Sequence, residues 1–184
     1  MKIIISFLLF IILTSASFGN PSFIKLGEIP RSSDLDKESI RLIPQSPKDW
    51  QDLSNDLVGP NKTVSAKNKK YSIESGEEDP DSGDLARYVF QLIKDGKKTL
   101  LGDGPLAWVH VSSDEQYIFY EPLTVLNTQN WSKQDLQKFI GNSGYYKILK
   151  YSKSARRVIV AGFDCTMDCP KTDKFILWQI LLDK

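Results

Sequence analysis

Short apolar runs separated by turn residues dominate the second half of the chain, and most of them alternate apolar with polar positions. This period of two predicts strands with one buried face. The predicted strands are 85–93, 99–101, 106–111, 116–120, 145–151, 156–161 and 175–182. Asp95-Gly96 lies between the first two strands, and this dipeptide is typical of two-residue hairpin turns. The last strand is apolar at every position except Gln179, so both of its faces must be covered.

Two segments have the residues that begin helices. Ser132 and Asp135 have the spacing of a capping box, which predicts one helix over about 132–140. Pro47 suits the first position of another, over about 47–57. The predicted fold is therefore mainly β, an antiparallel meander of hairpins with about seven strands, one inserted helix and an N-terminal helix.

The chain before residue 84 differs from the rest. Prolines interrupt it repeatedly, and its apolar residues occur singly or in pairs. A basic run over 62–70 is followed by an acidic run over 74–84, a pattern typical of solvated loops and linkers. We therefore expect 20–83 to be irregular or partly disordered and 84–184 to form a β-rich domain.

The first nineteen residues have the order of a secretory signal peptide. Lys2 precedes an apolar run, and small residues follow that run. The run is shorter than the roughly 20 residues that cross a bilayer. We expect 1–19 to be removed and the protein to be exported, to a periplasm or to the extracellular space, with no membrane span after removal.

The remaining chain is electrically balanced. Lys2 is the one charged residue among the first nineteen, so the rest carries 23 basic and 23 acidic side chains. A neutral chain has no overall field to attract it to nucleic acid, which binds concentrated positive charge. We predict a protein or a glycan as partner, and no nucleic acid.

The β-rich region carries a faint repeat with a spacing of about 40 residues. The matched positions are Trp108, Ile118 and Tyr120 with Ile148, Val158 and Val160. The segment 111–120 resembles the Ser-Pro-Asp-Gly-Lys-Tyr-Ile hairpin of TolB-like and WD40-like bacterial β-propellers. Matching residues are Ser112, Asp114, Tyr117 and Ile118. The resemblance spans about 104–162 and implies blade-like hairpins with roles in ligand capture or protein docking. It does not imply a whole propeller, since a ring needs at least about four blades.

Cys165 and Cys169 are the two cysteines of the chain. In an exported protein such a pair predicts one disulfide closing a short loop. An alternative is copper or redox handling, because Cys165, Met167 and Cys169 alternate and would place three sulfurs on one side of an extended loop. The disulfide is preferred, and no metal site or cofactor is predicted.

Candidate catalytic groups are few. His110 is the single histidine, and no nucleophile or orienting group stands out beside it. Loop carboxylates at Asp103, Asp114 and Asp164 provide the alternative of a small secreted hydrolase, which needs two carboxyl groups flanking a bond. No catalytic residue is assigned.

The preferred interpretation is an exported, non-catalytic binding or interaction module that presents loops from a β scaffold to a protein or glycan. Aromatic and charged side chains beside loops are the candidate contacts, because such residues anchor partners. They are Trp108, His110, Tyr120, Glu121, Tyr145, Tyr146, Arg156 and Arg157.

Overall fold

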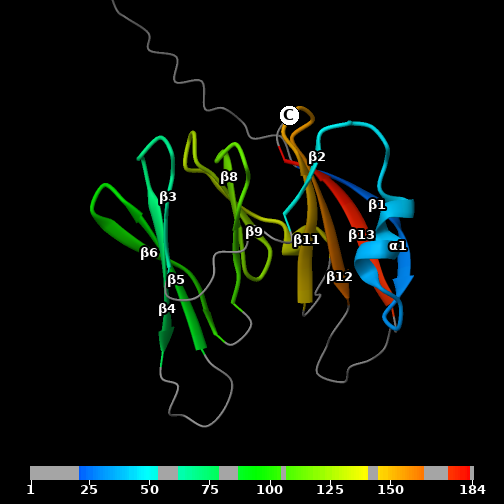
Figure 1. Cartoon of the computed structure of the whole chain (residues 1–184), viewed down its shortest axis with the longest axis horizontal. Coiled ribbons are helices and arrows are strands. Elements are labelled where there is room, and N and C mark those ends of the chain that lie inside the picture. The colour runs from blue at the N-terminus through cyan, green and yellow to red at the C-terminus, as the bar shows by residue number, and fades with distance from the viewer. Residues whose placement is uncertain are drawn as a thin grey trace, which may run out of the picture.

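The computed structural model describes residues 21–53, 62–78, 87–104, 107–140, 145–163 and 174–182. Three antiparallel sheets stand side by side in it (Figure 1). The predicted signal peptide and the pair Cys165 and Cys169, with Met167 and Asp164, lie outside the described residues. Among the described residues, no helix has the length and apolar character needed to cross a membrane.

The five-stranded sheet joins the two ends of the described chain. Its strands, in order, are β1 (Ser22–Pro30), β13 (Lys174–Leu181), β12 (Arg157–Phe163), β11 (Tyr145–Ser152) and β2 (Trp50–Asp52). One face packs under the helix α1 (Leu35–Leu42), with Leu35 and Leu42 against Leu177 and Ile159. Strand β13 also contributes Ile180 to the core on the opposite face. The prediction that this last strand is covered on both faces is confirmed.

Two four-stranded sheets complete the fold. The central sheet has the order β10 (Lys133–Asp135), β9 (Thr124–Asn127), β8 (Tyr117–Tyr120) and β7 (Val109–Val111). The outer sheet has the order β3 (Thr63–Ser65), β4 (Ser72–Glu78), β5 (Arg87–Lys94) and β6 (Lys97–Gly104). In both, successive strands are neighbours, so the predicted antiparallel meander is confirmed.

The central sheet contributes to two hydrophobic cores, one on each face. Phe119 and Tyr117 point toward the five-stranded sheet, where they meet Ile148 and Tyr151. Alternate residues such as Ile118 point the other way. This second core includes Ile73, Phe90, Leu92 and Leu101 from the outer sheet. The described residues thus stack as α1, five-stranded sheet, central sheet and outer sheet (Figure 1).

Residues 20–83 were expected to be irregular, and the structure corrects this. Their described part forms β1, α1, β2, β3 and β4. Strand β1 pairs with β13, and β4 pairs with β5, so both sides of residue 83 share sheets. The acidic residue Glu74 lies in β4 rather than in a linker. Isolated apolar residues are sufficient to form these strands, because most of the core that each strand packs against comes from later strands.

The predicted helix over 47–57 is wrong where the structure describes it. Trp50–Asp52 form β2, which pairs with β11. The Asp49 carboxylate accepts hydrogen bonds from the Ser152 and Ser154 hydroxyls at 2.6 and 2.8 Å, so it stabilises the β11–β12 turn and not the start of a helix. Long-range pairing has overridden the local helix signal.

The predicted helix over 132–140 is wrong in its first half. Residues 133–135 form β10, paired with β9, and α2 is confined to Gln137–Ile140. The Asp135 carboxylate accepts from the Gln137 amide at 3.1 Å at the start of this short helix, whereas Ser132 lies before β10. Helix α1 was missed, although Asp34 caps it by accepting from the Asp36 and Lys37 amides.

The 40-residue repeat corresponds to two hairpins of similar register. His110 pairs with Phe119 in β7–β8, and Lys150 pairs with Ile159, 40 positions later, in β11–β12. The resemblance to propeller blades remains a prediction.

Candidate functional site

A pocket of about 440 Å³ opens between the central and outer sheets. Its wall combines the hairpin β5–β6 with residues of β8, β9 and β10. The apolar lining residues are Leu92, Leu100, Leu101, Tyr120, Leu126 and Trp131. The polar ones are Lys94, Asp95, Lys97, Thr99 and Lys133. An apolar floor with a few polar groups is the composition of small-molecule sites.

The β5–β6 turn places two of these lysines at the pocket. Lys94 and Lys97 are paired residues on either side of Asp95-Gly96, as the sequence predicted. Asp95 and Gly96 have φ values of 50° and 73°, which the two central residues of a type I′ turn require. A two-residue turn of this type keeps both lysines close to the strands that line the pocket.

Trp131 has an unusual backbone. Its φ is 60°, which is strained for a large side chain. Its amide donates to the Asn127 carbonyl at 2.8 Å, and the Asn130 side chain accepts from the Ser132 amide at 2.9 Å. These bonds hold the indole between the sheets, where its ring meets Tyr71 edge to face with centroids 5.9 Å apart.

Positive charge surrounds the pocket. The Lys94 ammonium lies 4.5 Å from the centre of the Trp131 ring, and that of Lys133 lies 5.4 Å from the centre of the Tyr120 ring. Lys94 also contacts Asp95 at 3.1 Å. Within the described part of the chain, Lys97 and Lys133 form no ion pair. Three ammonium groups therefore face one carboxylate.

Trp108 and His110 lie close to each other, but they do not line this pocket. Their ring centroids are 5.4 Å apart, on the side of the central sheet that faces the five-stranded sheet. His110 is only 5% exposed, and burial lowers its pKa to about 4, against a smaller opposing effect of a hydrogen bond with the Leu53 backbone. Its Nδ1 has no hydrogen-bond partner among the described residues. At neutral pH the ring is an uncharged core group.

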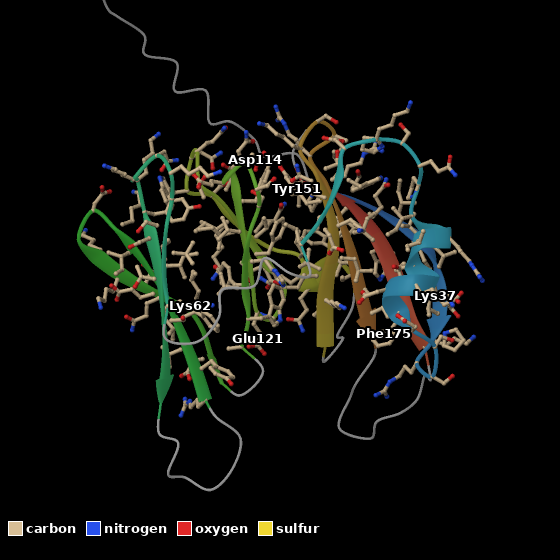
Figure 2. All side chains as sticks on the ribbon, in the orientation of Figure 1. Lys37, Lys62, Asp114, Glu121, Tyr151 and Phe175 are labelled. Carbon is tan, nitrogen blue, oxygen red and sulfur yellow. The ribbon has the colours of Figure 1, made fainter. Side chains whose placement is uncertain are left out.

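The other predicted contact residues do not gather into one site. Tyr120 lines the pocket, whereas Tyr146 is buried in the core between the central and five-stranded sheets. The Tyr145 side chain lies outside the described residues. Glu121 directly follows β8 of the central sheet (Figure 2), and burial raises its pKa. Of these side chains, only Tyr120 belongs to the pocket.

The basic residues of the β11–β12 hairpin are partly neutralised. Lys147 pairs with Asp36 at 2.9 Å, and Lys150 pairs with Asp52 at 3.3 Å. The candidate contacts Arg156 and Arg157 lie at the turn of this hairpin, where Arg156 has a φ of 49° and is exposed. The pocket lies elsewhere, between the central and outer sheets, so these two arginines do not line it.

Asp103 and Asp114, the two described carboxylates considered for a hydrolase, have structural partners. Asp103 accepts two hydrogen bonds from Arg87 at 2.6 and 2.7 Å, and these bonds lower its pKa. Asp114 accepts from the Ser112 hydroxyl at 2.7 Å and from the Tyr151 hydroxyl at 3.1 Å (Figure 2). Within the described ranges, no group of three or more His, Cys, Asp or Glu side chains could hold a metal ion.

Most of the residues that line the pocket were not predicted from the sequence. The turn at Asp95-Gly96 was predicted, but its flanking lysines were not marked as site residues, and Trp131 was expected only to precede the helix over 132–140. The available signal was the pair Asn127 and Asn130, whose side chains favour turns and break a helix before Lys133. No family model, curated protein or solved structure was found to match this chain.

Proposed function

We propose that the protein is a non-catalytic binding module whose ligand occupies the pocket between the central and outer sheets. The pocket itself supports this best: about 440 Å³ lies within the size range of ligand sites, and six apolar side chains line it.

The hydrolase alternative has less support. Asp103 and Asp114 each accept hydrogen bonds from neighbouring side chains, and neither lines the pocket. His110 is uncharged near neutral pH and lies in the other interface. The pocket lining contains one carboxylate, Asp95, which contacts Lys94. These positions favour binding over acid–base catalysis.

Phenylnaphthylamine, an uncharged dye that fluoresces in apolar sites, tests this proposal. We expect saturable binding of about one dye per protein. Leu100→Trp should abolish it, because Leu100 lines the pocket and is 57% exposed, so a larger ring there takes up pocket space. Ile40→Trp is the matched control, since Ile40 is a similarly exposed apolar residue on α1. It should leave binding unchanged.

A second variant covers the case in which the new indole of Leu100→Trp turns away into solvent. Trp131→Gly removes the aromatic wall and places at this positive φ the residue that accepts it best. We expect dye affinity to fall at least about tenfold while the fold persists. Undiminished binding in both variants, or no saturable binding to the wild type, would disprove the proposal.

A further inference from the structure

We infer that the pocket between the central and outer sheets takes an amphipathic anion, an aromatic or alkyl body that carries a carboxylate, sulfonate or similar charged head. This inference rests on the proposed function and specifies the chemistry of its ligand. It is carried by three features of the lining: the excess of ammonium groups, the scarcity of hydrogen-bonding groups on the floor, and the position of two ammonium groups over aromatic rings.

The charge of the lining favours an anion. Lys94, Lys97 and Lys133 contribute three positive charges against the single carboxylate of Asp95, although the chain as a whole has a net charge of only +1. Charge at a pocket mouth attracts an oppositely charged ligand and disfavours a like-charged one. A cationic ligand would meet these ammonium groups on entry.

The floor of the pocket favours an apolar body over a sugar. Leu92, Leu101 and Leu126 provide surface that cannot form hydrogen bonds, and Thr99 is the single uncharged aliphatic hydroxyl in the lining. A pyranose ring presents several hydroxyl groups, and each one left unpaired on burial costs free energy. An alkyl chain or a fused aromatic ring gains from the same surface.

The two cation–ring pairs bring these features together. Because the Lys94 ammonium lies 4.5 Å from the centre of the Trp131 ring, and that of Lys133 lies 5.4 Å from the centre of the Tyr120 ring, positive charge stands directly beside apolar surface. The aliphatic part of a lysine packs on such surface while its ammonium stays at the water boundary. A ligand can thus bury its body against the rings and place its head among the ammonium groups.

Anilinonaphthalene sulfonate tests the inference, because it adds an anionic group to the aromatic body of phenylnaphthylamine. We expect the wild type to bind the sulfonate at least about threefold to tenfold more tightly than the uncharged dye. The double variant Lys97→Gln, Lys133→Gln should remove this preference, so that the two dyes bind with similar affinity. Raising the salt to about 1 M should weaken binding of the sulfonate alone.

Lys153→Gln is the matched control, since Lys153 is an exposed lysine in the β11–β12 turn of the five-stranded sheet. It should leave both affinities as they are. Equal affinity for the two dyes in the wild type, with both lost in Leu100→Trp, would overturn the anion inference and leave the proposed function standing. Failure of the uncharged dye to bind saturably would instead refute the proposed function.

Discussion

The central sheet has one neighbour on each face, and the two interfaces are closed in different ways. Toward the five-stranded sheet, the rings of Tyr117, Phe119 and Tyr151 lie with centroids 5.9 to 6.3 Å apart, and a hydrogen bond from Tyr151 to Asp114 ties the sheets. A pocket of about 120 Å³ lies beside Tyr117. Toward the outer sheet, leucines and lysines surround the larger pocket. The first interface is built for stability and the second leaves room for a ligand.

Two hydroxyl groups show the same contrast. Tyr151 donates to Asp114 across the first interface at 3.1 Å. Tyr71, buried in the second, has no hydrogen-bond partner for its hydroxyl among the described residues. Burial is the main cause that raises the pKa of both, so both stay protonated at neutral pH. Only the first interface uses its tyrosine hydroxyl to join the sheets.

The largest effect on stability should come from the first interface. Phe119 is fully buried there, so Phe119→Ala should lower the free energy of unfolding by about 3–5 kcal/mol. Leu100→Ala, in the exposed wall of the pocket, should change it by less than about 0.5 kcal/mol. Urea denaturation followed by circular dichroism measures both. Equal losses would contradict the contrast between the interfaces.

Acid should weaken the first interface through His110. Its pKa in the folded protein is about 4, below the ordinary value of 6.5, so the unfolded chain binds a proton more readily between these pH values. This contribution is complete above pH 6.5 and is lost as the pH falls toward 4. Between pH 7 and pH 5 the loss should be about 2 kcal/mol.

The control for this titration is His110→Gln, which cannot gain the proton. Its free energy of unfolding at pH 7 will differ from that of the wild type, so the comparison uses only the change between the two pH values. That change should shrink by about 2 kcal/mol. If the free energy of unfolding changed equally between the two pH values in both proteins, His110 would not be the group responsible.

The tyrosine pair gives the next effect. Tyr151→Phe removes the hydrogen bond to Asp114 and should cost about 1–2 kcal/mol. Tyr71→Phe removes a buried hydroxyl without a described partner and keeps the ring against Trp131, so it should be neutral or stabilising. Thermal or urea unfolding of the two variants checks this order. A larger loss of unfolding free energy in Tyr71→Phe than in Tyr151→Phe would contradict this order.

The smallest effect on stability should accompany a clear effect on binding. Lys97 is exposed, so Lys97→Gln should change the free energy of unfolding by less than about 0.5 kcal/mol. If the sulfonate dye binds among the ammonium groups, the same change should weaken its binding. A loss of stability comparable to that of Tyr151→Phe would indicate a structural role for this lysine.

The sequence predicted elements whose signals are local. The hairpin at Asp95-Gly96 and the hairpin joining β11 to β12 were found because their turns and alternating residues lie close together in the chain. Strand β2 was not predicted, because it forms only by pairing with β11, about 100 positions away. The residues around it, such as Pro47, are typical of helix starts, so the local signal predicted a helix.

The two related hairpins show why the site was harder to find. In β7–β8, Ser112 donates to Asp114 within the turn at 2.7 Å. Forty positions later Ser152 remains, but Ser154 replaces the aspartate, and the carboxylate comes from Asp49 instead. A contact supplied from far along the chain leaves no local pattern. The pocket is of this kind, since it joins Lys97 to Trp131 across two sheets.

The four tryptophans allow the most direct test of the ligand site. Trp131 lines the pocket, whereas Trp50, Trp108 and Trp178 pack elsewhere. In a nitrogen–proton correlation spectrum of the full chain, titration with anilinonaphthalene sulfonate should shift the Trp131 indole signal, together with backbone signals of the β5–β6 turn, to saturation. The other three indole signals should stay in place. Saturable shifts at Trp108 or Trp178 with none at Trp131 would contradict the assignment of the pocket.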